Sequence, residues 1–268
     1  FGGVFVRAAV DGAPAPPNCE DLGAVWLGSC DADAGRAILA ARGFPEAATL
    51  LDRLQRFRAG GRYQGLPAQS RERLDSLVPR MLEQAARTAR PDATVTRALD
   101  FFETVSRRAA YLALLVEQPQ ALGRVVELLG SSSWAAEYLT RHPILLDELL
   151  DARLMTQAPD WSEFTATLRR EMAAHEGDVE RQMDVMREIH HAQVFRLLAQ
   201  DLGGLLSVER LADHLSLAAD LVLAVTLEVC WRRVPNRHVE TPRFAIIGYG
   251  KLGGKELGYA SDLDIVFL

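Results

Sequence analysis

Two aspartates near the end of the chain are the residues best suited to chemistry. Asp262 and Asp264 directly follow the segment "GYGKLGGKELGYAS" at positions 248–261. On a strand, residues two apart face the same side, about 6.6 Å apart along the chain. Carboxylate oxygens are the hard ligands that Mg²⁺ takes together with substrate phosphates. The pattern therefore predicts a magnesium site in which Asp262 and Asp264 are metal ligands and catalytic residues, although an isolated Asp-x-Asp is more often a surface turn.

The glycine cluster at positions 248–254 fits G-x-G-x-x-G after a short apolar run, so a dinucleotide-binding unit is the first hypothesis. A crossover to a parallel strand needs a dozen residues or more, and only about eight separate Gly254 from the next alternating run. A phosphate-binding P-loop is excluded because Glu256 follows Lys255 where Ser or Thr is required. The strands on either side are therefore expected to be adjacent and antiparallel. The glycines either let phosphate approach the backbone or simply form a hairpin turn.

Lys251 and Lys255 are the only lysines in the chain, and every other basic residue apart from histidine is an arginine. Lysine carries a compact charge that acts on phosphate differently from the planar arginine fork. We expect Lys251 to offset the charge of a triphosphate. Lys255 fits either that role or a solvated loop.

The elements that position these residues change character near the end of the chain. The apolar run Phe244–Ile247 ends in glycine and predicts a strand, and the alternation around Asp262 and Asp264 predicts a second. Upstream, apolar residues recur at helical spacing, so residues 92–233 are expected to be almost wholly helical and strands to lie only after Arg243. The predicted domains are a linker with short helices at 1–91, a helical bundle at 92–234 and the start of a further domain at 235–268.

Particular helices can be placed by their apolar stripes and end signals. One is expected to begin at Asp92 or Thr94 and to run through Val116, and Pro119 should open the next, ending at Gly130. Two short helices should meet at Pro143, and another should span "DWSEFTATLRREMAAH". Two long helices are expected at 178–201 and 208–233.

Composition narrows the function classes further. The chain of 268 residues is 49% hydrophobic, enough for a buried core, and its net charge of −6 predicts no nucleic-acid partner. The longest apolar run, "LVLAVTL", is shorter than the roughly 20 residues of a membrane span, so no membrane contact is expected. The chain begins at Phe1 without a signal peptide and is expected to be cut at both ends.

The cysteines and histidines predict no metal site. Three cysteines without ligand spacing indicate reduced thiols and a cytoplasmic location. The six histidines are expected to be surface or capping residues.

The segment "FAIIGYGKLGGKELGYASDLDIVFL" resembles the nucleotidyltransferase motif of the glutamate-ammonia-ligase (glutamine synthetase) adenylyltransferases, members of the DNA polymerase β-like superfamily. The likeness extends upstream through "RRAAYLALLVEQPQALGRVVELLGSSSWAAEYLTRHPILLDELLD" and covers about residues 95–268. It implies a mainly α fold, with a helical bundle followed by the first β-hairpin of a truncated α/β nucleotidyltransferase domain. The resemblance places Gly253 and Gly254 against nucleotide phosphates, Ser261 beside them, and Asp262 and Asp264 on Mg²⁺. A third carboxylate would come from a later strand, so this piece alone is expected to be inactive.

The resemblance also implies a reaction and partners. Family members carry one catalytic half that adds AMP from ATP to a tyrosine of glutamine synthetase and one that removes it by phosphorolysis. Tyr249 and "ELGYASDLD" resemble the adding half. A P-II-type signalling protein and glutamine are the expected regulators. The alternatives are the adenylyl-removing half and a helical regulatory module that binds the P-II-type protein.

Overall fold

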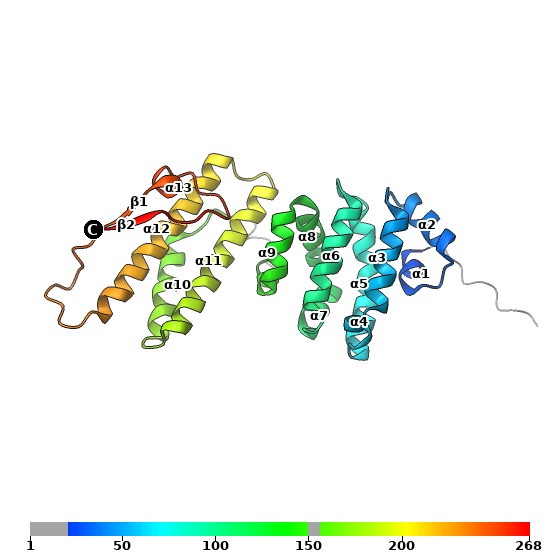
Figure 1. Cartoon of the computed structure of the whole chain (residues 1–268), viewed down its shortest axis with the longest axis horizontal. Coiled ribbons are helices and arrows are strands. Elements are labelled where there is room, and N and C mark those ends of the chain that lie inside the picture. Colours follow the sequence, from blue (N-terminus) through cyan, green and yellow to red (C-terminus); the bar gives the residue numbers. More distant parts are fainter. Residues whose placement is uncertain (1–20, 150–155) are drawn as a thin grey trace, which may run out of the picture. The chain divides into compact units, whose positions relative to one another are not determined.

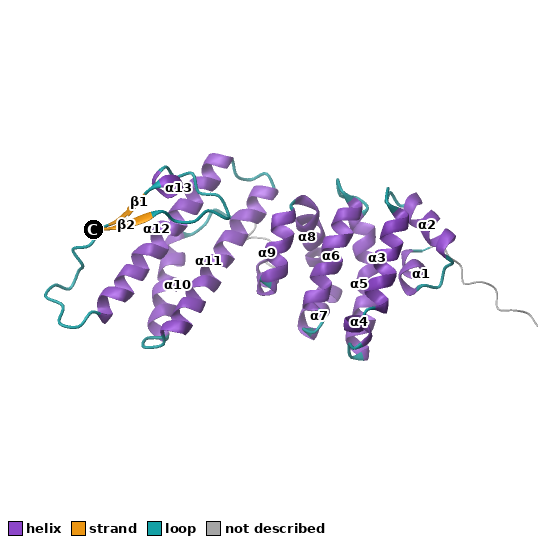
Figure 2. Cartoon of the chain, in the orientation of Figure 1, coloured by secondary structure: helices purple, strands orange, loops and turns teal. Residues whose placement is uncertain are grey.

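The computed structural model of the chain describes residues 21–149 and 156–268. Helices dominate these residues, and strands occur among them only near the C-terminal end (Figure 2). The dominance of helices confirms the predicted mainly α fold. The chain divides into two compact units, residues 1–136 and 137–268, which are described separately. The predicted boundaries at 91/92 and 234/235 stay a prediction.

Helix α5 (Ala68–Ala85) is the centre of the first unit, where it packs against α1, α6, α7 and α8 (Figure 1). Its side chains Leu74, Leu77 and Met81 are fully buried. The other helices of this unit are α1 (Leu22–Leu27), α2 (Ala32–Ala41), α3 (Ala47–Ala59), α4 (Gly61–Gln64), α6 (Pro91–Val105), α7 (Ala109–Glu117) and α8 (Pro119–Ser131). Helix α9 (Ser133–Arg141) contains the unit boundary.

The expectation of only short helices before residue 92 was wrong for α5, which is 18 residues long. A proline inside a helix removes a hydrogen bond and costs about 3 kcal/mol, so Pro79 argues against one continuous helix. The residues around it, Leu77, Val78, Met81 and Leu82, are fully buried. Burial of each such side chain contributes about 1.5–3 kcal/mol, so packing outweighs the local cost of the proline.

The helix expected from Asp92 through Val116 is two helices, α6 and α7, because the chain turns between them. The Ser106 hydroxyl donates to the Glu103 carbonyl at 2.9 Å, and Arg108 N donates to the Val105 carbonyl at 2.8 Å. Pro119 opens α8 as predicted, and α8 ends at Ser131, one residue beyond Gly130.

The second unit contains the 3₁₀ helix η1 (Pro143–Leu149), α10 (Trp161–Ala174), α11 (Val179–Leu202) and α12 (Val208–Arg233). These bounds confirm the predicted helices around Pro143 and the two long helices. Asp160, Asp178 and Ser207 cap α10, α11 and α12 by accepting a backbone N–H three residues on. A cluster of Phe164, Leu168, Met172 and Val225 joins α10 to α12.

Helix α12 is long and apolar enough, by length and composition alone, to cross a membrane. One such helix is weak evidence, since a packed core helix passes the same test, and α12 packs against α10 and α11. The absence of a membrane partner therefore stays a prediction.

The only strands of the described residues are β1 (Ile246–Gly248) and β2 (Ile265–Phe267), which pair antiparallel with Ile247 opposite Val266. The one-turn helix α13 (Gly250–Gly253) follows β1 directly. The predicted adjacent antiparallel strands after Arg243 are confirmed. Their membership of a larger α/β domain remains a proposal.

The cysteines correct one expectation. Cys230 is free and exposed, but Cys30 is disulfide-bonded, so the prediction of reduced thiols was wrong for Cys30. Spacing along the chain could not show this bond because it depends on which side chains folding brings together.

Candidate functional site

The hairpin formed by β1, α13 and β2 lies beside α12 (Figure 1). Ile246, Gly248 and Leu252 line a cavity of about 210 Å³ together with Asp220, Leu223, Ala224 and Leu227 of α12. Leu252 is 6% exposed and anchors α13. The hairpin is therefore held against α12 by a few apolar side chains.

Gly250 brings the turn directly against Asp264. Tyr249 N donates to the Asp264 carbonyl at 2.8 Å, and Gly250 has a φ of 52°, which favours glycine. A β-carbon on Gly250 would overlap the carboxylate oxygen Oδ2 of Asp264. The sequence places Gly250 in the G-x-G-x-x-G pattern, but Gly250 was not predicted to be a site residue. The G-x-G spacing is the feature that could have indicated its role.

Gly253 and Gly254 lie in the same turn, where their backbone N–H groups are already used. Gly253 N donates to the Tyr249 carbonyl and Gly254 N to the Gly250 carbonyl, both at 3.0 Å. A β-carbon on Gly253 would lie 2.5 Å from the Gly248 carbonyl oxygen. Packing alone thus accounts for glycine at position 253. The role of Gly253 and Gly254 towards phosphates stays a prediction.

Asp262 and Asp264 are exposed and lie just before β2, which begins at Ile265. The bond from Tyr249 N to the Asp264 carbonyl continues the strand pairing to that residue. Among residues 21–149 and 156–268, no group of three or more His, Cys, Asp and Glu side chains could hold a metal ion. The two carboxylates fit Mg²⁺ by their hard oxygens, and substrate phosphates would have to complete its coordination.

The remaining predicted binding residues surround this turn. Lys251 is exposed on α13, and Lys255 is exposed with a φ of 55° just after it. The Ser261 hydroxyl accepts the Gly258 N–H at 2.9 Å, which closes a turn immediately before Asp262. Their roles as ligands of a nucleotide stay predictions.

Comparison with known proteins identifies the family. A family model described as glutamate-ammonia ligase adenylyltransferase matches residues 122–268, more than half of the chain. The chain belongs to this family. A bifunctional glutamine synthetase adenylyltransferase/adenylyl-removing enzyme of Aromatoleum aromaticum is 56% identical over 251 residues, 94% of this chain and 27% of that protein. The enzyme of the same name from Chromobacterium violaceum is 49% identical over 268 residues, 100% of this chain and 29% of that protein.

These adenylyltransferase relatives extend the resemblance beyond its expected start near residue 95, because they align with 94% to 100% of the chain. The chain spans between 27% and 29% of their length. The activity of the whole enzyme is therefore a proposal for this chain.

One contact in this adenylyltransferase region was not predicted from the sequence. The Tyr259 hydroxyl donates to Asp201 Oδ2 at 2.8 Å and so ties the loop before β2 to the C-terminal end of α11. Burial raises the pKa of the Tyr259 hydroxyl, and the bond to the Asp201 carboxylate raises it further. The hydroxyl therefore stays a hydrogen-bond donor. The only sequence signal for this contact is the aromatic residue Tyr259 within "ELGYASDLD".

Four histidines, His142, His190, His191 and His214, correct the expectation of surface or capping residues. His142 and His191 have ring centroids 4.2 Å apart, and Tyr138 packs against both rings. Burial, with the nearby His142, lowers the pKa of His191 to about 4, and burial lowers the pKa of His190. These side chains are half-buried, and so is His214, whose ring centroid lies 5.7 Å from that of Trp161. The expectation holds for the exposed His238 and for His175, which ends α10.

Proposed function

We propose that this chain is the part of a glutamine synthetase adenylyltransferase in which the helical region meets the nucleotidyltransferase site. The intact enzyme would transfer AMP from ATP to a tyrosine of glutamine synthetase and so regulate nitrogen assimilation. The observation that carries the proposal is the glycine turn lying against Asp264, with Asp262 exposed two residues earlier. Membership of the family and its relatives' names support the same reaction.

The residues of this chain would act by positioning a charged substrate. Asp262 and Asp264 would hold Mg²⁺, which when bound neutralises charge on a triphosphate. Lys251 would face the same phosphates, and Gly253, Gly254 and Ser261 would lie beside them. The tyrosine hydroxyl of glutamine synthetase would attack the α-phosphorus as pyrophosphate leaves in line.

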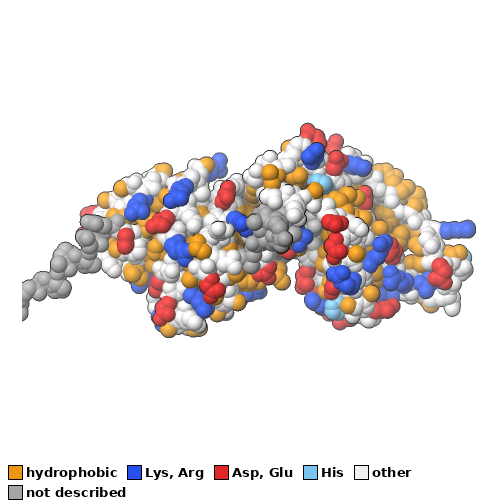
Figure 3. Space-filling model, turned by 180° about the vertical axis from the view of Figure 1, so that it is seen from behind, with side chains coloured by type: hydrophobic (Ala, Val, Ile, Leu, Met, Phe, Trp, Pro, Cys, Tyr) orange, Lys and Arg blue, Asp and Glu red, His pale blue; other side chains and the backbone are white. Residues whose placement is uncertain are grey.

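Further proposals concern the catalytic half, the partners and the location. The motif favours the adenylyl-adding half, and the adenylyl-removing half is the alternative because the relatives are named for both reactions. A P-II-type protein is proposed as a regulatory partner, and the cell interior is proposed as the location. On the face seen in Figure 3, acidic and basic side chains are interspersed, which suits the proposed absence of a nucleic-acid partner.

The test measures both reactions in an intact adenylyltransferase that contains this region. Asp262→Asn and Asp264→Asn should each lower AMP addition at least about a hundredfold, because a hard cation site loses an anionic ligand. Removal of AMP should persist. Asp213→Asn, an exposed change on α12, is the matched control.

The outcomes separate the alternatives. Normal AMP addition in either site variant would refute the metal-ligand role. Loss of AMP removal with addition retained would assign the region to the adenylyl-removing half.

A further inference from the structure

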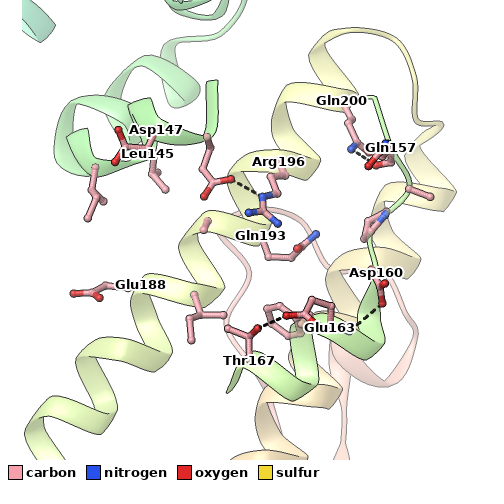
Figure 4. A pocket seen from close by; sticks show the side chains of 17 residues that line it. Leu145, Asp147, Gln157, Asp160, Glu163, Thr167, Glu188, Gln193, Arg196 and Gln200 are labelled. Atoms are coloured by element: carbon pink, nitrogen blue, oxygen red, sulfur yellow. Dashed lines mark hydrogen bonds and ion pairs between the residues drawn. The ribbon is translucent and has the colours of Figure 1, made fainter. Parts of the chain in front are cut away.

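A pocket of about 570 Å³ opens between η1, α10 and α11 (Figure 4), and none of its lining residues belongs to the glycine turn or is one of its aspartates. Its volume lies in the range of small-molecule sites, roughly 300–1,000 Å³. Apolar side chains, among them Leu145, Phe164 and Ile189, form part of its wall. The pocket can therefore receive a small ligand that has an aliphatic portion.

The charge of this pocket is strongly negative. Five acidic residues and a single arginine line it, and the arginine, Arg196, is already paired by its Nε with Glu148 at 2.5 Å. The remaining acidic residues are Asp147, Asp160, Glu163 and Glu188. Anionic ligands such as nucleotides would be repelled, whereas a cation would be attracted into the pocket.

The acidic side chains differ in how far their charge is offset. The Glu163 carboxylate accepts from the Thr167 hydroxyl at 3.0 Å and lies 4.0 Å from the Arg170 guanidinium, and Glu188 lies 3.4 Å from the exposed Arg181 guanidinium. Asp147 has no hydrogen bond or ion pair with any residue that the structure describes. Such weakly screened charges at the rim leave a ligand ammonium group with available partners.

Gln193 supplies an independent sign of a ligand. Its side chain is 95% buried, being 5% exposed, and lines the pocket, and within the described part of the chain its amide makes no hydrogen bond. Figure 4 shows the amide directed into the pocket between Arg196 and Glu163. Gln200 on the same helix differs, because its amide nitrogen donates to the Gln157 carbonyl at 2.8 Å. The Gln193 amide is therefore available to pair with a ligand group that enters the pocket.

We propose that this pocket binds a small organic cation, a short aliphatic amine with two ammonium groups. One ammonium group would donate to the Gln193 amide oxygen, and the other would lie among Asp147 and its acidic neighbours at the rim. The methylene chain would pack on Leu145, Phe164 and Ile189. This site is separate from the nucleotide site and does not depend on the proposed transferase activity.

Isothermal titration calorimetry of this chain with 1,4-diaminobutane tests the proposal. We expect saturable binding at one site, weakening as salt is raised, and no binding of the uncharged analogue 1,4-butanediol. Asp147→Asn should raise the Kd about three- to tenfold, as should Gln193→Met, which keeps the side chain's length but removes the amide. Asp184→Asn is the matched control, since Asp184 is on α11, pairs with Arg187 and does not line the pocket.

The variants also separate a binding defect from misfolding. Asp147 is exposed, so its substitution should leave the melting temperature of the free chain unchanged even if Gln193→Met lowers it. The proposal is overturned if diaminobutane does not bind saturably, or if the diol binds equally well. It is also overturned if Asp147→Asn and Asp184→Asn give the same Kd.

Discussion

Helix α5 and the C-terminal hairpin are both rich in apolar side chains, yet the fold covers them very differently. Leu74, Leu77 and Met81 of α5 are fully buried between neighbouring helices. In β2, Val266 is 45% exposed and Phe267 is 57% exposed. The hairpin therefore relies on two paired strands and a few contacts with the helices, and such a pair is marginally stable by itself.

The proposed catalytic residues therefore lie next to a hairpin whose apolar side chains are less buried than those of α5. Leu252, which lines a cavity with residues of α12, and the bond from Tyr259 to Asp201 link the hairpin to the helices. Changes in the helical core should act on global stability, and changes in the hairpin on local order and activity.

The largest expected effect is in the helical core. Leu77→Ala should lower the free energy of unfolding by about 2–5 kcal/mol, because a fully buried side chain leaves a cavity. Val266→Ala in the exposed hairpin should change it by no more than about 0.5 kcal/mol. Urea denaturation followed by circular dichroism measures both. Equal effects would show that the hairpin is part of the same cooperative core.

Gly250→Ala should disrupt the hairpin while leaving the helices folded. The new β-carbon would overlap Asp264, and a positive φ costs a non-glycine residue about 1–2 kcal/mol. Hydrogen exchange of the Tyr249 amide, which donates to the Asp264 carbonyl, should accelerate by about ten- to thirtyfold.

Gly123→Ala in α8 is the matched control for Gly250→Ala. Its β-carbon would lie 3.8 Å from the Gln84 side chain, an ordinary contact, so it should stabilise the helix by about 0.5–1 kcal/mol. Unchanged exchange at Tyr249 in Gly250→Ala would contradict the close packing of the turn on Asp264.

Tyr259→Phe should loosen the loop that carries Asp262 by removing one hydroxyl. The lost bond to Asp201 is worth about 0.5–1.5 kcal/mol, and the ring can keep its packing. In an intact adenylyltransferase we expect the Mg²⁺ concentration needed for half-maximal AMP addition to rise severalfold with little change in melting temperature. A melting temperature that falls with unchanged Mg²⁺ dependence would assign the bond a purely structural role.

The smallest expected effect is a loss of helical stability in acid. The folded-state pKa of His191, about 4, lies below the ordinary 6.5, so folding favours the neutral ring. This contribution is fully present above pH 6.5 and is lost as pH falls towards 4. After solvent screening it should amount to no more than about 1 kcal/mol. The urea midpoint should fall less steeply with decreasing pH in His191→Phe than in the unchanged chain. An equal slope in the two proteins would contradict the lowered pKa of His191.

Much of the fold follows from local sequence patterns. Apolar spacing and end signals such as Pro119 located α8 and the long helices α11 and α12, because each pattern acts within a few residues. The short distance from Gly254 to the next alternating run required adjacent antiparallel strands, as observed. The candidate aspartates were found in the same way, since spacing alone can place two carboxylates next to a glycine turn.

Tertiary structure decided what depends on residues far apart in the sequence. The Tyr259 hydroxyl meets Asp201 across 58 residues, and Gln193 gains its significance only because η1 and α10 enclose a pocket around it. Burial around Pro79 likewise kept α5 continuous against its local cost. Chain spacing determined where most of the later helices and the two strands form, and where the candidate catalytic carboxylates lie. Packing determined which side chains meet, because distances between elements depend on how all of them fit together.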